Sequence, residues 1–367
     1  MTSTANPTLP LRRVGIVGAG VMGAGIAQLC LQKGFKVSLY DESPEASCKA
    51  AGRIKKGIED AATRGKIASG EIERALNSIS YAKSLEELSG AELVIEAIAE
   101  DLPAKKSLFE RLGRIVPSSM LATNTSSLSV AEIAAGAASP ERVLGLHFFN
   151  PPVATKLVEV IRAPRTSGEV FKAARDFVAA LGKTPIQAKD KPGFIVNRVM
   201  RPYYLACQRL VSKRCPPALL DRMARELGEV PMGPFELMDL IGLDVNLAIT
   251  KVIYESLGRP ERLKPQPLQE ALVAQGHWGR KTGRGFYLYA DGKRMGENPE
   301  ALSRLSELGP PPEEAWEKTI GAVVLEAQLA HDTGIASRED IDVAIKLAMN
   351  FPKGPFEWRP RAAKTAP

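Results

Sequence analysis

Residues Val14–Gly25 read VGIVGAGVMGAG, an apolar strand that runs directly into the pattern G-x-G-x-x-G. In this pattern Gly18 allows a tight turn, Gly20 lets the backbone approach a pyrophosphate, and Gly23 lets the following helix pack on the strand. The helix that follows offers unpaired N–H groups and the positive end of its dipole to phosphates. The stretch therefore predicts a dinucleotide-binding unit, with the cofactor in contact with Gly18, Gly20, Val21, Met22 and Gly23.

An acidic residue follows the second predicted strand. Residues 35–40 (FKVSLY) form that strand, and Asp41 ends it, 23 residues after Gly18. A carboxylate at about this distance binds the adenosine ribose of NAD. No arginine follows Asp41 to hold a 2′-phosphate, so NAD is favoured over NADP. An ordinary strand–helix turn is the alternative, because glycine-rich turns are common.

The chain of 367 residues is too long for one ordinary core and predicts two or three domains. Strands and helices alternate up to residue 190, which predicts an α/β Rossmann-type doubly wound sheet for residues 12–190. From residue 191 the apolar residues are spaced by three and four, which predicts all-α C-terminal domains. We further expect a disordered tail at 1–11, a helical substrate and dimerisation domain at 191–290, a linker at 291–312 and a second, abbreviated helical repeat at 313–361.

A six-residue pattern occurs twice in the helical part. Residues 231–236 (PMGPFE) recur as residues 352–357 (PKGPFE), and an aspartate precedes each copy by ten residues, Asp221 and Asp342. This matched spacing indicates a duplicated helical unit rather than chance. Duplicated helical units usually pack on one another or on a partner subunit.

Bulk composition argues against several classes of protein. The residues are 44% hydrophobic and 25% charged, as in soluble globular proteins, and no apolar run approaches the roughly 18 residues of a membrane span. The net charge of +7 comes from basic residues scattered among acidic ones, which argues against a nucleic-acid partner. The four cysteines have neither metal-site nor disulfide spacing, so we expect reduced thiols, no metal and a cytoplasmic location; they are Cys30, Cys48, Cys207 and Cys215.

One of the three histidines lies where catalytic sites form in α/β proteins. His147 ends a predicted strand, and Glu159 lies on the next one, residues 157–161, which alternates like a strand at a sheet edge. Hairpin-like pairing would bring the carboxylate to the imidazole, where it fixes the tautomer and stabilises the imidazolium formed on proton abstraction. A structural histidine is the alternative. His277 and His331 are interpreted as surface residues.

Two more polar side chains stand at candidate positions. Ser126, in the run 124–128 (NTSSL) behind a short strand, could donate to a substrate oxygen, with a helix N-cap as the alternative. Asn197 lies one turn into a helix directly after the predicted domain junction, where it faces a cleft or solvent. No nucleophile signature such as G-x-S-x-G surrounds Ser126, so acyl-enzyme chemistry is not indicated.

In chain order, a set of motifs resembles the L-3-hydroxyacyl-CoA dehydrogenase family over residues 12–289. They are the glycine loop and the runs 94–100 (VIEAIAE), 124–128 (NTSSL), 147–151 (HFFNP), 156–160 (KLVEV), 191–198 (KPGFIVNR) and 231–236 (PMGPFE). Residues 313–360 resemble a second copy of the family's C-terminal helical domain, such as occurs in its longer members.

The resemblance implies reversible, NAD-dependent oxidation of an L-3-hydroxyacyl-CoA to a 3-ketoacyl-CoA, in fatty-acid β-oxidation or related acyl-CoA metabolism. His147 matches the family's general base, and Glu159 matches the acid that orients it. Ser126 and Asn197 match residues that bind the substrate's reacting oxygens. The other positions implied to contact NAD are Asp41 at the adenosine ribose, Glu100 and Lys105 near the nicotinamide, and Asn124.

The resemblance leaves the CoA contacts and the oligomeric state open. Basic residues between 53 and 66 fall where the family's CoA-binding helices lie, although a solvated helix face explains them equally well. Residues 204–208 (YLACQ) lack a glutamate often found in that helix of the family, whereas the second repeat has one at Glu326. The chain is expected to act as a homodimer through its helical domains, or as a monomer if the second repeat fills that surface.

Two other functions stay open on the sequence. One is a dehydrogenase of a free hydroxy acid, as in the gulonate dehydrogenase and lambda-crystallin branch. The other is a non-catalytic nucleotide-binding protein on the same scaffold. Retention of the four residues implied to carry the chemistry argues against the second.

Overall fold

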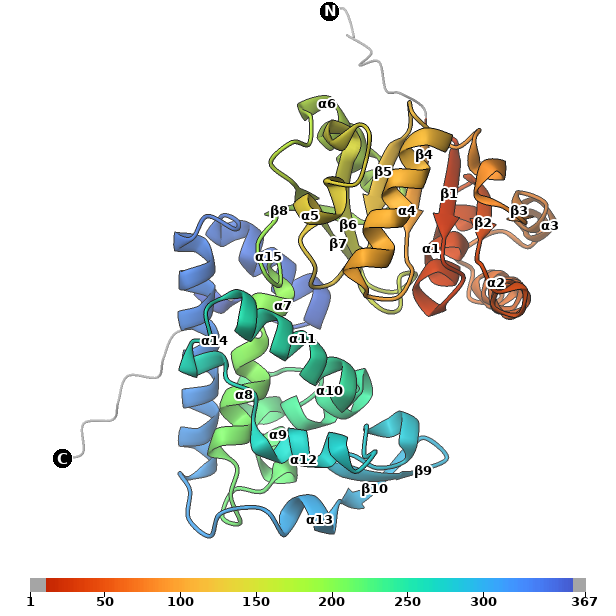
Figure 1. The fold of residues 1–367 in the computed structure, drawn as a ribbon. Helices are drawn as coiled ribbons and strands as arrows, with labels where there is room; N and C mark the ends of the chain where they lie inside the picture. The colour runs from red at the N-terminus through yellow and green to blue at the C-terminus, as the bar shows by residue number, and fades with distance from the viewer. Residues whose placement is uncertain (1–10, 359–367) are drawn as a thin grey trace, which may run out of the picture. The chain divides into compact units, whose positions relative to one another are not determined.

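The computed structural model describes residues 11–358, which divide into two compact units, one up to residue 190 and one from residue 191 (Figure 1). Apart from Leu11, the tail expected at residues 1–11 lies outside the described residues, as do residues 359–361 of the expected second repeat. None of the helices within residues 11–358 combines the length and the apolar character that a membrane span needs.

The first unit is an eight-stranded sheet in the order β3-β2-β1-β4-β5-β6-β7-β8. All neighbouring strands are parallel except β6 and β7. The order reverses beside β1, which is where doubly wound sheets bind ligands at the carboxyl ends of their strands. The strands are β1 (Arg13–Val17), β2 (Lys36–Tyr40), β3 (Ile79–Ala82), β4 (Leu93–Glu96), β5 (Met120–Thr123), β6 (Val143–Phe148), β7 (Leu157–Arg162) and β8 (Thr184–Lys189).

Helices cover this sheet, and Figure 1 shows α4 lying across one face of it. They are α1 (Val21–Gln32), α2 (Pro44–Thr63), α3 (Ile72–Leu76), α4 (Leu102–Ile115), α5 (Val130–Ala134) and α6 (Gly168–Ala180). Side-chain oxygens of Ser43, Asp101 and Ser167 accept hydrogen bonds from the first turns of α2, α4 and α6. Such N-caps satisfy backbone donors that a helix leaves unpaired, which fixes where these helices begin. The expected Rossmann-type sheet is confirmed.

The position of one strand in the first unit differs from expectation. Strand β7 lies inside the sheet, between β6 and β8, and the edge strand is β8. Pro185 in β8 suits an edge, because proline cannot donate to a further strand. Helix α2 ends at Thr63, two residues before Gly65, whose φ of +68° breaks the helix.

The second unit is mainly helical. Its helices are α7 (Val196–Val199), α8 (Arg201–Leu210), α9 (Pro217–Gly228), α10 (Pro234–Ile241), α11 (Leu243–Ser256), α12 (Pro267–Ala274), α13 (Pro299–Leu302), α14 (Pro312–Asp332) and α15 (Arg338–Met349). Figure 1 shows α14, in blue, running beside α8, and the two helices pack on each other. The expected helical C-terminal region is confirmed, with one small hairpin added.

Residues 291–312, expected as a linker, contain a strand and a short helix. An antiparallel hairpin of β9 (Tyr287–Ala290) and β10 (Lys293–Glu297) begins this stretch, and α13 follows. Asp291 and Gly292 form the turn with φ values of +48° and +71°, the combination that a two-residue hairpin of type I′ requires. The Asn298 side chain then caps α13. The Asp-Gly pair was the signal for this hairpin.

The repeated pattern has one structural cause in both copies. The carboxylate of Asp221 accepts hydrogen bonds from the backbone N–H groups of Phe235 (2.9 Å) and Glu236 (3.0 Å). The Asp342 carboxylate accepts one from Phe356 N–H at 2.9 Å. A Cβ on the glycine of either copy would lie within 2.4 Å of its aspartate. The aspartate and the glycine are therefore one unit, which explains their fixed spacing.

The three glycines of the glycine loop, Gly18, Gly20 and Gly23, are needed for different reasons. Gly18 has a φ of +106°, and a Cβ there would lie 2.5 Å from Ala97 O. A Cβ on Gly23 would lie 1.8 Å from Gly18 O, so the start of α1 packs directly on the loop. A Cβ on Gly20 would meet no heavy atom within 4 Å. Gly20 thus borders open space at the N-terminus of α1, whereas the other two are required by the fold.

Replacement of Gly23 by alanine is expected to lower the free energy of unfolding by about 1–3 kcal/mol, because the added methyl group overlaps backbone. Replacement of Gly20 by alanine should leave the thermal midpoint within a degree or two, since nothing in the protein is displaced, but should weaken NADH binding. Thermal unfolding and fluorescence titration with NADH measure both quantities. A Gly20→Ala variant that binds NADH as tightly as the wild type would contradict a pyrophosphate at this loop.

Candidate active site

Asp41 ties the glycine loop to the start of α2. Its Oδ2 accepts a hydrogen bond from Ala19 N–H at 2.6 Å, and its Oδ1 accepts one from Ser43 N–H at 2.8 Å. The Asp41 carboxylate, at the end of β2, therefore lies beside the glycine loop. A ribose hydroxyl of the cofactor is expected at this place. Val21 is 60% exposed at the start of α1, which leaves that helix N-terminus accessible. The loop fits a dinucleotide.

His147 and Glu159 face each other across the antiparallel pair β6–β7. His147 Nδ1 and Glu159 Oε2 are 2.6 Å apart, the glutamate is fully buried, and the histidine is 5% exposed. An ionised carboxylate only accepts hydrogen bonds, so an ionised Glu159 would hold the imidazole proton on Nδ1. The expected pairing of these two residues is observed.

Asn124 fixes the backbone beside this histidine. Its Oδ1 accepts a hydrogen bond from Phe148 N–H at 2.8 Å, which links the end of β5 to the end of β6. The ring of Phe149 lies 4.4 Å from the imidazole, centroid to centroid. Asn124 therefore holds the strand end that carries His147.

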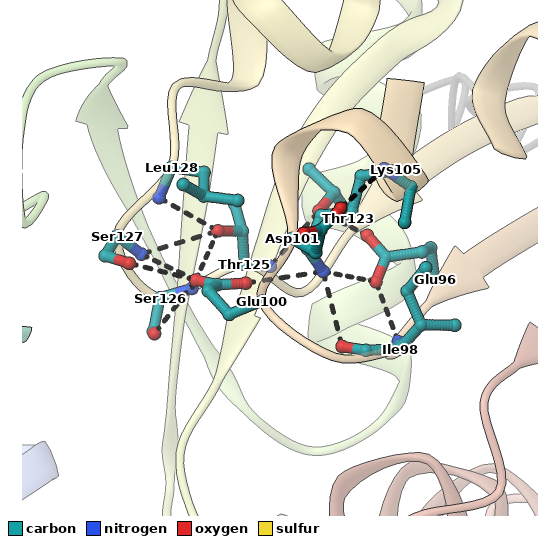
Figure 2. Close-up of polar contacts among 11 residues, drawn as sticks. Glu96, Ile98, Glu100, Asp101, Lys105, Thr123, Thr125, Ser126, Ser127 and Leu128 are labelled. Atoms are coloured by element: carbon teal, nitrogen blue, oxygen red, sulfur yellow. Dashed lines mark hydrogen bonds and ion pairs between the residues drawn. The ribbon is translucent and has the colours of Figure 1, made fainter. Parts of the chain in front are cut away.

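Glu100 binds the loop that carries Ser126 through several hydrogen bonds (Figure 2). Its Oε1 accepts hydrogen bonds from the hydroxyl of Thr125 at 2.7 Å, from both N–H and hydroxyl of Ser126 at 2.9 and 3.2 Å, and from both N–H and hydroxyl of Ser127 at 3.1 Å each. Its other oxygen lies 3.3 Å from Lys105 Nζ. Burial alone would raise the pKa of Glu100, but Lys105 and these donors lower it below its ordinary value.

A buried ion pair lies behind Glu100, as Figure 2 shows. Lys105 Nζ is 2.5 Å from Glu96 Oε1, and both side chains are at most 1% exposed. Glu96 also accepts from Ile98 N–H at 2.8 Å and from the Thr123 hydroxyl at 2.7 Å. A buried charge that loses its partner costs about 3–5 kcal/mol, so removal of either residue is expected to be strongly destabilising. Glu96 therefore anchors Lys105, which in turn holds Glu100.

Glu96 and Thr123 were missed by sequence reasoning. They end neighbouring strands and stand directly opposite each other in the register of β4 and β5. A glutamate that closes the apolar run LVIE is the signal that could have found the pair, because charged residues are almost never fully buried without a partner.

The remaining predicted residues belong to the second unit. Asn197 belongs to the second unit, on α7, and its backbone carbonyl accepts a hydrogen bond from Arg201 Nε at 2.9 Å. His277, expected at the surface, is 9% exposed, with Asn298 Nδ2 3.4 Å from its Nδ1. Within residues 11–358, no group of three or more His, Cys, Asp or Glu side chains is arranged to hold a metal ion.

Comparisons with known proteins identify the family. Residues 13–191 match the NAD-binding domain of 3-hydroxyacyl-CoA dehydrogenase, and residues 193–289 match the C-terminal domain of the same family. The 3-hydroxyadipyl-CoA dehydrogenase of Escherichia coli K12 is 33% identical over 95% of this chain and 90% of its own length. A probable 3-hydroxybutyryl-CoA dehydrogenase of Bacillus subtilis is 41% identical over 77% of this chain and 99% of its own.

Structural similarity agrees with these matches. The crystal structure of a 3-hydroxybutyryl-CoA dehydrogenase from Escherichia coli K12 has a TM-score of 0.86 at 33% identity, covering 95% of this chain and 91% of that one. The chain belongs to the 3-hydroxyacyl-CoA dehydrogenase family, an NAD-binding family of oxidoreductases.

Proposed function

We propose that this protein oxidises L-3-hydroxyacyl-CoA to 3-ketoacyl-CoA, reversibly and with NAD, and that His147 is the general base. The observation that carries the proposal is the 2.6 Å contact between His147 Nδ1 and the buried Glu159 carboxylate. The relatives named above, 3-hydroxyadipyl- and 3-hydroxybutyryl-CoA dehydrogenases, support the substrate class.

The pair suits a proton transfer that accompanies hydride transfer. In oxidation, His147 Nε2 takes the proton of the substrate's 3-hydroxyl group, and the Glu159 carboxylate stabilises the imidazolium. In reduction, the imidazolium returns the proton to the carbonyl oxygen. When bound, NAD supplies the acceptor or donor of the hydride at C3. A positioned general acid or base of this kind contributes about 10²–10⁴-fold to rate.

Ser126 and Asn197 are proposed to bind the reacting oxygens of the substrate. The five hydrogen bonds to Glu100 Oε1 hold the Ser126 loop in one conformation, so its hydroxyl is positioned in advance. Glu100 and Lys105 are proposed to lie near the nicotinamide, and Asp41 at the adenosine ribose. Exposed basic residues on and after α2 suit the phosphates of CoA: Arg53, Lys55, Lys56, Arg64 and Lys66.

The setting of the reaction is proposed to be cytoplasmic acyl-CoA metabolism, such as fatty-acid oxidation. The four cysteines are unpaired, and three of them are buried: Cys30, Cys207 and Cys215. Unpaired cysteines are usual in reducing compartments.

His147→Gln is expected to lower kcat for NADH-dependent reduction of acetoacetyl-CoA by about 10²–10⁴-fold, because no group remains to deliver the proton. NADH affinity should stay within twofold of the wild type. His331→Gln, at a half-buried histidine on α14, is the matched control and should keep wild-type kcat. Initial rates with acetoacetyl-CoA, and with free acetoacetate for comparison, test the proposal. Turnover of the free acid but not the thioester would overturn the substrate class.

Glu100→Gln is expected to destabilise the protein at pH 7 and to lower kcat, since a neutral amide oxygen cannot replace a carboxylate that accepts five hydrogen bonds. The lowered pKa of Glu100 sets the pH dependence. The stability advantage of the wild type over the variant should be complete above pH 4.5 and shrink as pH falls through the lower folded-state pKa.

Chemical unfolding of both proteins between pH 3 and 7 measures this difference. Glu110→Gln, at an exposed glutamate of α4 paired with Arg114, serves as the control and should change stability by less than about 0.5 kcal/mol at any pH. An equal stability difference at pH 3 and pH 7 would rule out the charge of Glu100 as the cause.

A further inference from the structure

A fully buried glutamate from the second helical repeat reaches the helix that carries Asn197. Glu326, on α14, pairs through its Oε1 with Arg198 Nε, and Arg198 directly follows Asn197 in α7. The Arg198 side chain is 4% exposed and the Glu326 side chain is fully buried. A second arginine, Arg262, is partly exposed and also pairs with this glutamate, with its Nε 2.7 Å from Glu326 Oε2.

The first helical repeat offers no carboxylate for this purpose. Helix α8 follows α7 directly and reads RPYYLACQRL, without an acidic residue. Within residues 11–358, the carboxylate paired with Arg198 is the one on α14, outside the part of the chain that matches the family's C-terminal domain, residues 193–289. The second repeat therefore supplies a charge that the first repeat lacks.

Helix α7 cannot hold its own position. It is four residues long, and one turn of helix is unstable without tertiary contacts. It follows a turn in which Gly193 and Phe194 have φ values of +78° and +46°. Because Phe194 is not glycine, this backbone persists only where its surroundings fix it.

Two buried arginines connect α7 to other helices of the second unit, one to α11 and the other to α14. Arg201 donates from its Nε to Asn197 O at 2.9 Å and from its Nη1 to Asn246 O and Thr250 Oγ1 of α11, each at 3.1 Å. Arg198 is held by Glu326 of α14. Asn197 thus lies between one anchor in the first repeat and one anchor in the second.

We propose that Glu326 is a positioning residue for Asn197, so that the second helical repeat is required for turnover and not only for stability. This inference rests on the proposed function, in which Asn197 binds a reacting oxygen of the substrate. Loss of the Glu326 charge leaves Arg198 buried without a counter-charge, and α7 relaxes. A shift of about 1 Å at a positioning group lowers turnover by about a hundredfold.

The test compares Glu326→Gln, the double variant Arg198→Met/Glu326→Leu and the control Glu317→Gln. Glu317 is exposed on the same helix, so its variant should match the wild type. Glu326→Gln keeps the shape and one acceptor of the side chain. The double variant replaces the ion pair with apolar side chains of similar size, which usually restores stability.

Four quantities are measured: kcat for acetoacetyl-CoA, KM for acetoacetyl-CoA, the dissociation constant of NADH, and the hydrogen–deuterium exchange of residues 193–201. We expect Glu326→Gln to lower kcat by about 10–100-fold and speed exchange in that segment, with NADH affinity unchanged. The double variant should regain the wild-type unfolding midpoint but not the wild-type kcat. Wild-type kcat in Glu326→Gln, or recovery of kcat together with stability in the double variant, would overturn the inference.

A failure of the proposed function is recognised separately. If the wild type itself does not reduce acetoacetyl-CoA with NADH, the substrate assignment fails. The exchange experiment then decides the structural part alone. Faster exchange of residues 193–201 in Glu326→Gln supports the coupling of α14 to α7, and unchanged exchange overturns it.

Discussion

The antiparallel pairing of β6 and β7 is the constraint on which the candidate active site depends. Every other neighbouring pair in the eight-stranded sheet is parallel. This one reversal places His147 directly opposite Glu159, and side chains opposite each other in an antiparallel pair start only about 4.5–5.5 Å apart at Cβ. Because both strands lie inside the sheet, the carboxylate is fully buried and its hydrogen bond to the imidazole does not compete with water.

Within each unit, fully buried carboxylates lie beside residues that are proposed to take part in the chemistry. Glu159 orients His147, Glu96 anchors Lys105 behind Glu100, and Glu326 holds Arg198 beside Asn197. Buried ion pairs add little net stability, since desolvation offsets most of their attraction. These pairs instead fix the position of side chains. A carboxylate that accepts several hydrogen bonds is held in one orientation, and this orientation determines where its partner lies.

The sequence predicted the parts of the site that local chemistry dictates. The glycine loop and Asp41 follow from what a dinucleotide requires of the backbone, and the facing of His147 and Glu159 follows from two adjacent strands. The hairpin at Asp291 was missed because a run rich in Gly and Pro was interpreted as a linker without testing the turn type. The inside position of β7 was missed because strand order is a long-range property, which alternation along one strand does not encode.

The burial of individual polar residues also could not be predicted from the sequence. His277 stands in a glycine-rich stretch, yet Asn298 and α13 cover it, and those contacts come from residues expected to be a linker. Glu96 lies in an apolar run whose only sign of function is its charge. The role of Glu326 needs two segments 128 residues apart, so only the folded chain brings it to Arg198.

The most direct measurement is the ¹⁵N NMR spectrum of the imidazole nitrogens, at a pH where His147 is neutral. With three histidines in the chain, the His147 signals are identified by their loss in His147→Gln. Nδ1 is predicted to carry the proton, bonded to Glu159, and Nε2 to be unprotonated. A neutral His147 that carries its proton on Nε2 would contradict the orientation of the base and with it the proposed chemistry.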